Sequence, residues 1–288
     1  MQANSDGAWI LVTGATAGIG KALVARLATD GRNVIAAARD PARVRIPNGP
    51  GRVEAVRLDF EEPSTIEAAA GDVARIAGAA GLAGLVNMAG IIVEGPLEAI
   101  PTQALRRQFE VNVIGPVALT QAVLPMLAKA RGAIVNIGAV SAHLTPPFYG
   151  PIAASKAALA SLNDAMRLEF AQFGIRVFLI EPGAMKTGIF ATAKAARDVW
   201  LADRPDLERR YRPAFAAMER AFEKSGADDP EVVVTAVIAV LSGRRARLRT
   251  VVGKGAGAFV LASRLPIRLR DRLVKSALGL SEALRPAN

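Results

Sequence analysis

Short apolar runs alternate along this chain with longer segments in which apolar residues recur at helical spacing. Seven such runs are short enough to be strands: 9–12, 33–38, 53–58, 84–88, 133–137, 176–180 and 250–252. The run at 9–12 is continuously apolar, which is typical of a strand that is buried on both faces of a sheet. The longest intervening segments show helical spacing and predict helices over 20–28, 63–78, 102–129 and 151–173.

Strands separated by helices predict βαβ units with a parallel sheet and right-handed crossovers. We therefore expect an α/β fold, a Rossmann-type doubly wound parallel sheet with helices on both faces, in a single domain. Neither an internal repeat nor a linker divides the sequence. Residues 1–255 are interpreted as the body of this domain, including a mixed helical segment at 188–225, and residues 256–288 as a basic, amphipathic C-terminal extension of it.

Composition narrows the chemistry that the chain can perform. The 288 residues include no cysteine and one histidine, His143, which excludes disulfides, cysteine zinc sites, iron–sulfur clusters and histidine-rich metal sites. No metal site is predicted. The first seven residues lack the features of a signal peptide, and no run of 18 uninterrupted apolar residues is present. A cytoplasmic protein is the expectation.

The net charge of +10 is concentrated near the C-terminus. Residues 244–288 carry eleven Lys and Arg against two acidic residues, Asp271 and Glu282. This local patch indicates contact with a lipid surface, a phosphate or a partner chain. Residues 256–280 alternate apolar and basic side chains, so peripheral membrane contact is one interpretation, and packing on the chain's own domain is the other. The absence of an aromatic platform or DNA-binding motif argues against nucleic acid as a partner.

A glycine-rich segment directly follows the first predicted strand. It reads Thr13-Gly-Ala-Thr-Ala-Gly-Ile-Gly20, and a helical segment comes next. Glycines allow a tight turn and a close approach of the backbone to a pyrophosphate, which the free N–H groups of the following helix would bind. The predicted contacts of a dinucleotide in this segment are Gly14, Thr16, Gly18, Ile19 and Gly20.

The Gly14-x-x-x-Gly18-x-Gly20 spacing resembles that of short-chain dehydrogenases/reductases, and further motifs extend the resemblance to about residue 253. The resemblance implies a homodimer or homotetramer, a small-molecule substrate covered by residues 188–225, and a nicotinamide cofactor. Asn112 matches the active-site asparagine of the family. The other implied cofactor contacts are Asp59, Asn87, Ala89, Gly90, Lys156, Pro182, Gly183 and Thr187, with Met88 in place of the family's second asparagine.

The end of the second strand bears on which nucleotide is bound. NAD-dependent enzymes place a carboxylate near this point to bond the ribose hydroxyls, but this sequence has Ala38 there. Arg39 follows and is suited to pair with a 2′-phosphate. NADP(H) is therefore predicted over NAD(H), although Asp40 can face the same space and Arg39 can be an ordinary solvated cation.

The catalytic set of the family is incomplete in this chain. Active members carry a serine and a Tyr-x-x-x-Lys pair, in which the tyrosine gives a proton to the substrate carbonyl. The segment Ile152-Ala-Ala-Ser-Lys156 keeps the lysine but has isoleucine at the tyrosine position, and Ala139 occupies the serine position. Because isoleucine has no ionisable group, it cannot act as a general acid.

Three nearby polar residues are candidates to replace the missing groups. Tyr149 precedes the helix of Lys156 by a few residues and is a candidate acid, while Ser141 and His143 follow the serine position. Each has a simpler interpretation: Tyr149 as a packed aromatic residue, and Ser141 and His143 as polar groups of a loop.

Two functional hypotheses follow. In the first, the protein is an NADP(H)-binding oxidoreductase with atypical proton delivery that acts on an apolar carbonyl, imine or enone, because cofactor geometry alone supplies part of the rate. In the second, it is a non-redox enzyme or pseudoenzyme that binds cofactor or ligand without carbonyl reduction. Aromatic residues in the covering segment favour a large apolar substrate, among them Trp200, Tyr211, Phe215 and Phe222.

Overall fold

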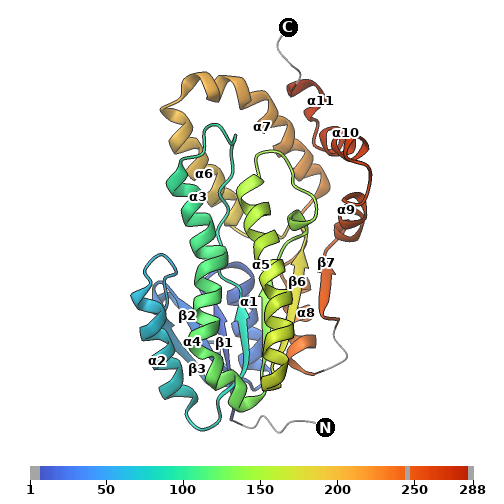
Figure 1. The fold of residues 1–288 in the computed structure, drawn as a ribbon. Helices are drawn as coiled ribbons and strands as arrows, with labels where there is room; N and C mark the ends of the chain where they lie inside the picture. The colour runs from blue at the N-terminus through green and yellow to red at the C-terminus, as the bar shows by residue number, and fades with distance from the viewer. Residues whose placement is uncertain (1–6, 244–246, 285–288) are drawn as a thin grey trace.

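The computed structural model describes residues 7–243 and 247–284 (Figure 1). Residues 1–6, 244–246 and 285–288 lie outside this description, including the N-terminal segment and three arginines of the basic C-terminal stretch. The described chain forms one seven-stranded sheet with helices on both faces, as the sequence predicts.

All seven strands run parallel, in the order β3-β2-β1-β4-β5-β6-β7. Their bounds are β1 Trp9–Thr13, β2 Asn33–Ala38, β3 Val53–Arg57, β4 Leu82–Asn87, β5 Ala133–Ile137, β6 Arg176–Pro182 and β7 Arg249–Val252. The strand order reverses between β1 and β4, and ligands of doubly wound sheets bind at the carboxyl ends of the strands beside such a reversal.

Two apolar cores lie on the two faces of the sheet. On one face, α2 (Ser64–Ala77), α4 (Gly115–Ala130) and α5 (Gly150–Glu169) pack over side chains such as Leu11, Leu85 and Ile134. On the other face, α1 (Gly18–Thr29) and α8 (Glu231–Leu241) cover Ile10, Val86 and Val135. Burial on both faces explains why the central strands, such as β1 and β5, are almost entirely apolar, whereas the edge strands β3 and β7 carry charged residues.

The helix predicted over 102–129 is not one regular α-helix. It consists of α3 (Thr102–Phe109), a π-helical turn η2 (Glu110–Ile114) and α4. Such turns insert one residue into the helical ladder and are frequent at functional sites, and this one contains Asn112. By length and composition Thr102–Ala130 is apolar enough to cross a membrane, but half of its most apolar stretch is buried in this domain, where α4 packs on α2 and β4.

The remaining helices lie beyond the carboxyl ends of the strands and along one side (Figure 1). Residues 188–225 form α6 (Ile189–Ala202) and α7 (Pro205–Ser225). The C-terminal extension forms α9 (Ala256–Ala262), α10 (Ile267–Ala277) and α11 (Leu280–Ala283). Leu280 is buried against Ala214, Ala217 and Met218 of α7, so the end of the extension packs on the domain.

Candidate active site

The glycine loop after β1 leaves no room for side chains. A Cβ on Gly20 would lie 2.2 Å from the carbonyl oxygen of Gly14, and one on Gly14 would lie 2.9 Å from the Cα of Ala89. Helix α1 begins at Gly18 with no side-chain cap and no acidic residue in its first turn. Its first N–H groups and its partial positive charge are therefore suited to an anion such as a pyrophosphate.

Thr13 ties this loop to the end of β4. Its hydroxyl oxygen accepts hydrogen bonds from the backbone N–H groups of Met88 and Ala89, both at 3.0 Å. On the opposite side of the loop, a Cβ on Gly18 would lie 3.2 Å from the Cγ2 of Thr187. The structure therefore brings together three predicted segments of the cofactor site: the glycine loop, residues 87–90 and Thr187.

Asn112 holds the backbone of the loop that follows β4. Its Oδ1 accepts from the N–H of Ile91 at 2.9 Å, and its Nδ2 donates to the carbonyl of Ile91 at 3.0 Å. The same Nδ2 lies 3.3 Å from the Oγ of Ser155, whose hydroxyl donates to the carbonyl of Ile152 at 2.8 Å. The asparagine thus connects the loop after β4 to the first turns of α5, and it is buried in doing so.

Lys156 reaches the same point from α5. Its ammonium donates a 2.6 Å hydrogen bond to the carbonyl of Ile137 at the end of β5. A Cβ on Gly90 would lie 3.3 Å from the Oδ1 of Asn112 and 3.8 Å from the Nζ of Lys156, so the three residues converge. Burial lowers the pKa of Lys156 to about 8, because a charged ammonium loses hydration there.

The structure places apolar side chains where proton donors are expected. Ile152 is buried on the first turn of α5, four residues before Lys156, and Ala139 lies two residues after the end of β5. Neither side chain can donate a hydrogen bond or a proton. Lys156 and Ile152 share one face of α5, as residues four apart on a helix do. The assignment of Ile152 to the tyrosine position stays a prediction.

At the end of β2, Arg39 and Asp40 are both exposed. The Asp40 carboxylate accepts a 3.1 Å hydrogen bond from the N–H of Ala42 and caps the short helix Pro41–Arg43. Asp59, after β3, similarly accepts from the N–H of Glu61 at 3.0 Å. Because the side chain of Asp40 is engaged in its own turn, it competes less for the space that Arg39 would share with a phosphate.

Asn87 is buried among other amides rather than in the cleft. Its Nδ2 donates to the Oδ1 of Asn136 at 2.8 Å and lies 3.3 Å from the hydroxyl of Thr120. Asn136 in turn donates to Asn163 on α5 at 3.0 Å. The Oδ1 of Asn87 has no hydrogen-bond partner among the described residues. This arrangement holds β4 to β5, and direct contact between Asn87 and a cofactor stays a prediction.

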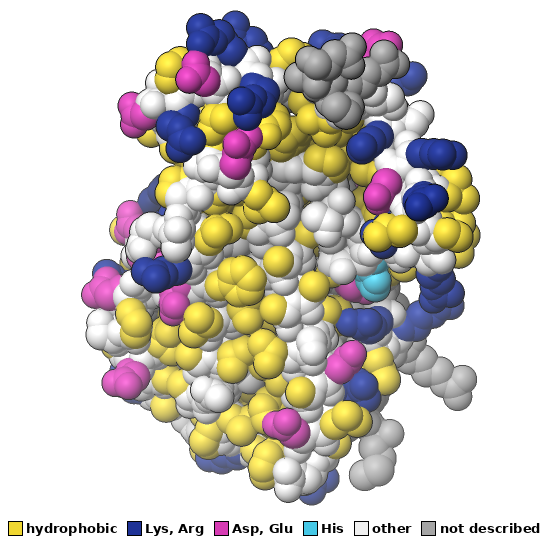
Figure 2. All heavy atoms as spheres, turned by 45° about the horizontal axis from the view of Figure 1, so that its top comes forward, with side chains coloured by type: hydrophobic (Ala, Val, Ile, Leu, Met, Phe, Trp, Pro, Cys, Tyr) yellow, Lys and Arg dark blue, Asp and Glu magenta, His cyan; other side chains and the backbone are white. Residues whose placement is uncertain are grey.

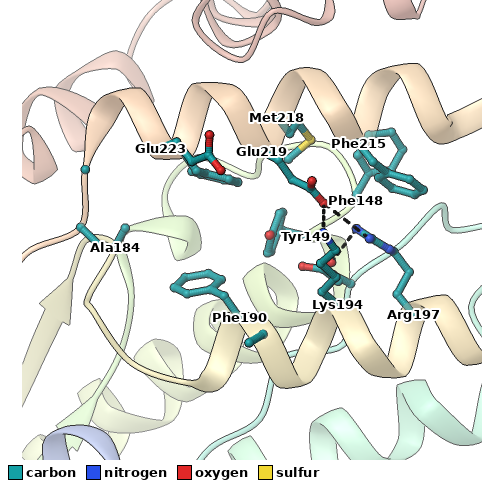
Figure 3. Close-up of a pocket in the computed structure, with 15 residues that line it drawn as sticks. Phe148, Tyr149, Ala184, Phe190, Lys194, Arg197, Phe215, Met218, Glu219 and Glu223 are labelled. Atoms are coloured by element: carbon teal, nitrogen blue, oxygen red, sulfur yellow. Dashed lines mark hydrogen bonds and ion pairs between the residues drawn. The ribbon is translucent and has the colours of Figure 1, made fainter.

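A cavity of about 300 Å³ opens between α6 and α7 (Figure 3). It borders Ala184, directly after Pro182-Gly183, and Tyr149, three residues before Ile152. Its apolar lining includes Phe148, Phe190, Phe215, Met218 and Phe222. Phe148 has a positive φ of 68°, a strained conformation for a bulky residue, and its carbonyl accepts from the N–H of Gly95 at 2.8 Å.

Charged residues also line this cavity. Glu94 and Arg197 form a buried ion pair at 2.8 Å, with side chains 5% and 8% exposed. Tyr149 hydrogen-bonds Glu94, and burial together with the charge of Glu94 raises the pKa of this tyrosine. Burial also raises the pKa of Glu94, against the opposing effects of Tyr149 and Arg197. Tyr149 does reach the cavity, but as a weak acid whose hydroxyl is held toward a carboxylate.

The other two polar candidates do not line this cavity. The Nε2 of His143 lies 2.8 Å from the Oε1 of the buried Glu181, and the histidine faces a second, smaller pocket against α10. Ser141 lies in the short helix Val140–Ala142 and lines neither pocket. Their roles in proton transfer stay predictions. Among the described residues, no group of three or more His, Cys, Asp or Glu is arranged to hold a metal ion.

Sequence reasoning missed several of the residues that shape the cavity. Phe190, Lys194 and Arg197 share one face of α6, a spacing visible in the sequence, but only the fold shows that this face is turned toward α7. Of the aromatic residues predicted to cover a substrate, Phe215 and Phe222 line the cavity, whereas Trp200 packs near Gly95 and Tyr211 bonds Glu98 at 2.6 Å.

Comparison with known proteins agrees with this geometry. The family model for short chain dehydrogenase matches residues 8–198. The chain belongs to the short-chain dehydrogenase family. The chain is 32% identical over 223 residues to the NADPH-dependent 3-dehydrocapnine reductase of Ornithobacterium rhinotracheale. The match covers 75% of this chain and 77% of that protein. It is also 32% identical over 219 residues to human retinol dehydrogenase 5, covering 73% and 68% of the two chains.

Solved structures of the family share the whole fold. A short-chain dehydrogenase from Streptomyces avermitilis has a TM-score of 0.70 at 27% identity, with coverage of 97% of this chain and 98% of that one. A short-chain dehydrogenase from Burkholderia cenocepacia in complex with NADP has a TM-score of 0.70 at 25% identity, with coverage of 99% and 100%. The predicted family and fold class are both confirmed.

Proposed function

We propose that this short-chain dehydrogenase is an NADP(H)-dependent oxidoreductase that acts on an apolar substrate without the usual tyrosine and serine proton donors. The observation that carries the proposal is the contrast around Lys156. Asn112, Gly90 and Lys156 converge at the carboxyl end of the sheet, while Ile152 and Ala139 beside them have no proton to give. In this proposal, the residues that would hold the cofactor are retained, and the residues that would donate a proton are replaced by apolar ones.

The residues present fit a dinucleotide. The uncapped start of α1 and the glycine cradle would hold its phosphates, and Arg39 would pair with a 2′-phosphate. Lys156 and Asn112 would hold the nicotinamide riboside. When bound, this cofactor supplies a hydride. The NADPH-dependent reductase and the NADP complex among the similar proteins support NADP(H), while other similar structures are complexes with NADH. The choice between the two therefore rests on Arg39.

The protein's own residues would orient the reactants and exclude water. The aromatic side chains of α6 and α7 cover an apolar substrate, which fits a carbonyl, imine or enone with a sizeable apolar body. The Tyr149 hydroxyl, held toward Glu94, would contribute a hydrogen bond rather than a readily released proton. Positioning alone contributes to the rate of hydride transfer.

The test combines NADPH titration with turnover of matched ketone, enone and iminium substrates. We expect tight NADPH binding, poor turnover of simple ketones, and turnover of at least one substrate class that needs no enzymatic proton. Binding of NADPH with no turnover of any class would support the second hypothesis, a non-redox protein or pseudoenzyme on this fold. Failure to bind NADPH or NADH would contradict the proposal.

Two surfaces support proposals about partners. The face around α4 and α5 exposes Ile114 of η2 together with Leu162 and Leu168 of α5, and hydrophobic side chains are visible over this face in Figure 2. We infer that it pairs two copies into a homodimer, measurable by light scattering. On the far edge, α10 has no buried residue and exposes apolar and basic side chains side by side, which favours contact with an anionic lipid surface of a cytoplasmic membrane.

A further inference from the structure

Three aromatic rings of the cavity lie close together and face a common space. The centroids of Tyr149 and Phe222 are 5.8 Å apart, and Phe190 lies 6.4 Å from each of them. The pairs are inclined rather than stacked, with interplanar angles of 86°, 68° and 35°. Figure 3 shows Tyr149, directly before α5, and Phe190, on α6, turned toward the interior of the cavity.

No cation of the described residues lies over these three rings. Elsewhere in the same cavity, the guanidinium of Arg197 lies 4.2 Å from the ring centroid of Phe215, so the chain uses that ring for a cation–π contact of its own. The Tyr149–Phe190–Phe222 group therefore offers ring faces that a cationic ligand can use. Aromatic cages of this kind favour organic ammonium ions over neutral ligands of equal shape.

The charges of the cavity favour a cation as well. Its lining holds three carboxylates, Glu94, Glu219 and Glu223, against two cations. Both cations are already paired, since Lys194 lies 2.9 Å from Glu219 and Arg197 lies 2.8 Å from Glu94. Glu223 follows Phe222 on α7 and forms no hydrogen bond or ion pair with the described part of the chain, which leaves its negative charge for a ligand at the cavity rim.

A cationic substrate also explains why the site has lost its proton donors. Reduction of a ketone needs a hydride at carbon and a proton at oxygen, and Ile152 and Ala139 cannot supply the proton. Reduction of an iminium ion, R₂C=N⁺R₂, needs no proton. Its carbon accepts a hydride from NADPH, the π electron pair moves onto nitrogen to leave a neutral tertiary amine, and NADP⁺ is the second product. Solvent can protonate the amine afterwards.

We propose that the Tyr149–Phe190–Phe222 cavity binds an apolar organic cation and that the substrate is an iminium ion reduced to a tertiary amine. This inference rests on the NADPH-dependent function proposed above, because the hydride comes from that cofactor. It adds the chemical class of the substrate, and it gives the loss of the tyrosine and the serine a chemical reason.

Calorimetry with two matched ligands tests cation binding without any redox step. The first is benzyldimethyl(2-hydroxyethyl)ammonium, and the second is 3,3-dimethyl-4-phenylbutan-1-ol, in which carbon replaces nitrogen. We expect the cation to bind at least about tenfold more tightly, in line with a partly desolvated cation–π cage. Phe222→Leu should remove most of this preference, whereas Phe173→Leu, which alters an exposed ring elsewhere, should not.

The contribution of charge is tested by Glu223→Gln, with Glu169→Gln as a control that changes the net charge equally at an exposed site on α5. We expect only Glu223→Gln to weaken binding of the cationic probe, and we expect this loss of affinity to be larger at low salt. Equal affinity for the two ligands, or equal effects of Phe222→Leu and Phe173→Leu, would overturn the inference.

The reaction itself is tested with N-methyl-3,4-dihydroisoquinolinium and its ketone analogue 1-tetralone, each with NADPH. We expect consumption of NADPH with the iminium and little with the ketone. A protein that binds NADPH and the ammonium probe but leaves the iminium unreduced would refute the assigned substrate class. Absence of NADPH binding alone would instead refute the proposed function. The comparison of the two ligands would still test whether Tyr149, Phe190 and Phe222 bind a cation.

Discussion

The ammonium of Lys156 donates its 2.6 Å hydrogen bond to the backbone carbonyl of Ile137 and has no carboxylate partner among the described residues. A neutral carbonyl compensates a buried positive charge only in part. The chain therefore keeps a lysine in a costly environment, at the point where Gly90 and Asn112 also meet. Because a merely structural role does not require a charge there, this arrangement supports a role in binding the cofactor.

This lysine predicts a specific dependence of stability on pH. Its pKa is about 8 in the folded protein and 10.5 as the ordinary value, so between these values the unfolded chain binds more protons. The contribution of this group to the free energy of unfolding thus rises as pH increases from 8 to 10.5. Below pH 8 the lysine is charged in both states, and the full cost of burying its charge destabilises the fold. In the Lys156→Met variant this pH-dependent rise in the free energy of unfolding, roughly 3–4 kcal/mol, should be absent.

Urea denaturation at a series of pH values measures this effect as the difference between wild type and Lys156→Met. Lys129→Met, which removes an exposed lysine of α4, serves as the control for general charge effects. A difference between wild type and Lys156→Met that stays constant across the window would show that Lys156 is not perturbed.

The second prediction concerns the nucleotide. NADPH should bind more tightly than NADH, and Arg39→Ala should cost about 1.5–3 kcal/mol in NADPH affinity, tenfold or more, with little change for NADH. The reason is the loss of a charged hydrogen-bonding fork to the 2′-phosphate. Fluorescence titration measures both ligands, and Arg75→Ala is the matched control on an exposed turn of α2. Equal affinity of the wild type for NADPH and NADH would show that Arg39 does not bind the 2′-phosphate.

The third prediction restores the missing donors. Ala139→Ser together with Ile152→Tyr should raise ketone reduction by at least ~10²-fold, because general acid catalysis typically contributes ~10²–10⁴-fold. Ala139→Ser with Ile152→Phe is the control that adds the same bulk without the hydroxyl. Because Ile152 is buried, circular dichroism should accompany the rate measurements to show that both variants fold. Brisk ketone turnover by the wild type would mean that another proton donor operates.

The fourth prediction concerns the buried pair of Arg197 and Glu94. Arg197→Met leaves a buried carboxylate without its partner and should destabilise the fold by about 3–5 kcal/mol. Adding Glu94→Gln should recover part of this loss, because the second variant removes the uncompensated charge. Thermal and urea denaturation of the single and double variants gives the coupling. If the losses in the free energy of unfolding of the two single variants add up to that of the double variant, Arg197 and Glu94 do not stabilise each other.

The fifth prediction concerns α10. The wild type should sediment with anionic vesicles at low salt and less at high salt, because its arginines attract the surface while apolar side chains insert. Leu269→Ser with Leu273→Ser should reduce binding several-fold, on the order expected for lost apolar burial. Val199→Ser, an exposed apolar position on α6, is the control. Absence of vesicle binding at low salt would leave α10 as an element of the domain surface alone.

The sequence by itself determined the sheet, and it predicted the residues of the candidate cofactor site. Parallel strands that are buried on both faces are mostly apolar. Segments such as 33–38 and 133–137 can therefore be recognised as strands from the sequence alone. The glycine spacing and the register of Lys156 are local, because a tight turn and a helical repeat depend on neighbours in the chain. For the same reason Ile152 and Ala139 could be placed before any fold was known.

Only the tertiary structure decided what surrounds a substrate. Glu94 and Arg197 are 103 positions apart. Tyr149 comes from the turn before α5, Phe190 from α6 and Phe222 from α7. Their contacts depend on how α6 and α7 cross above the strand ends, which no local pattern encodes. The structure also showed that the Asp40 carboxylate caps its own turn and that Asn112 sits in a π-helical turn. These features follow from packing and hydrogen bonding in three dimensions, whereas propensity and spacing act along the chain.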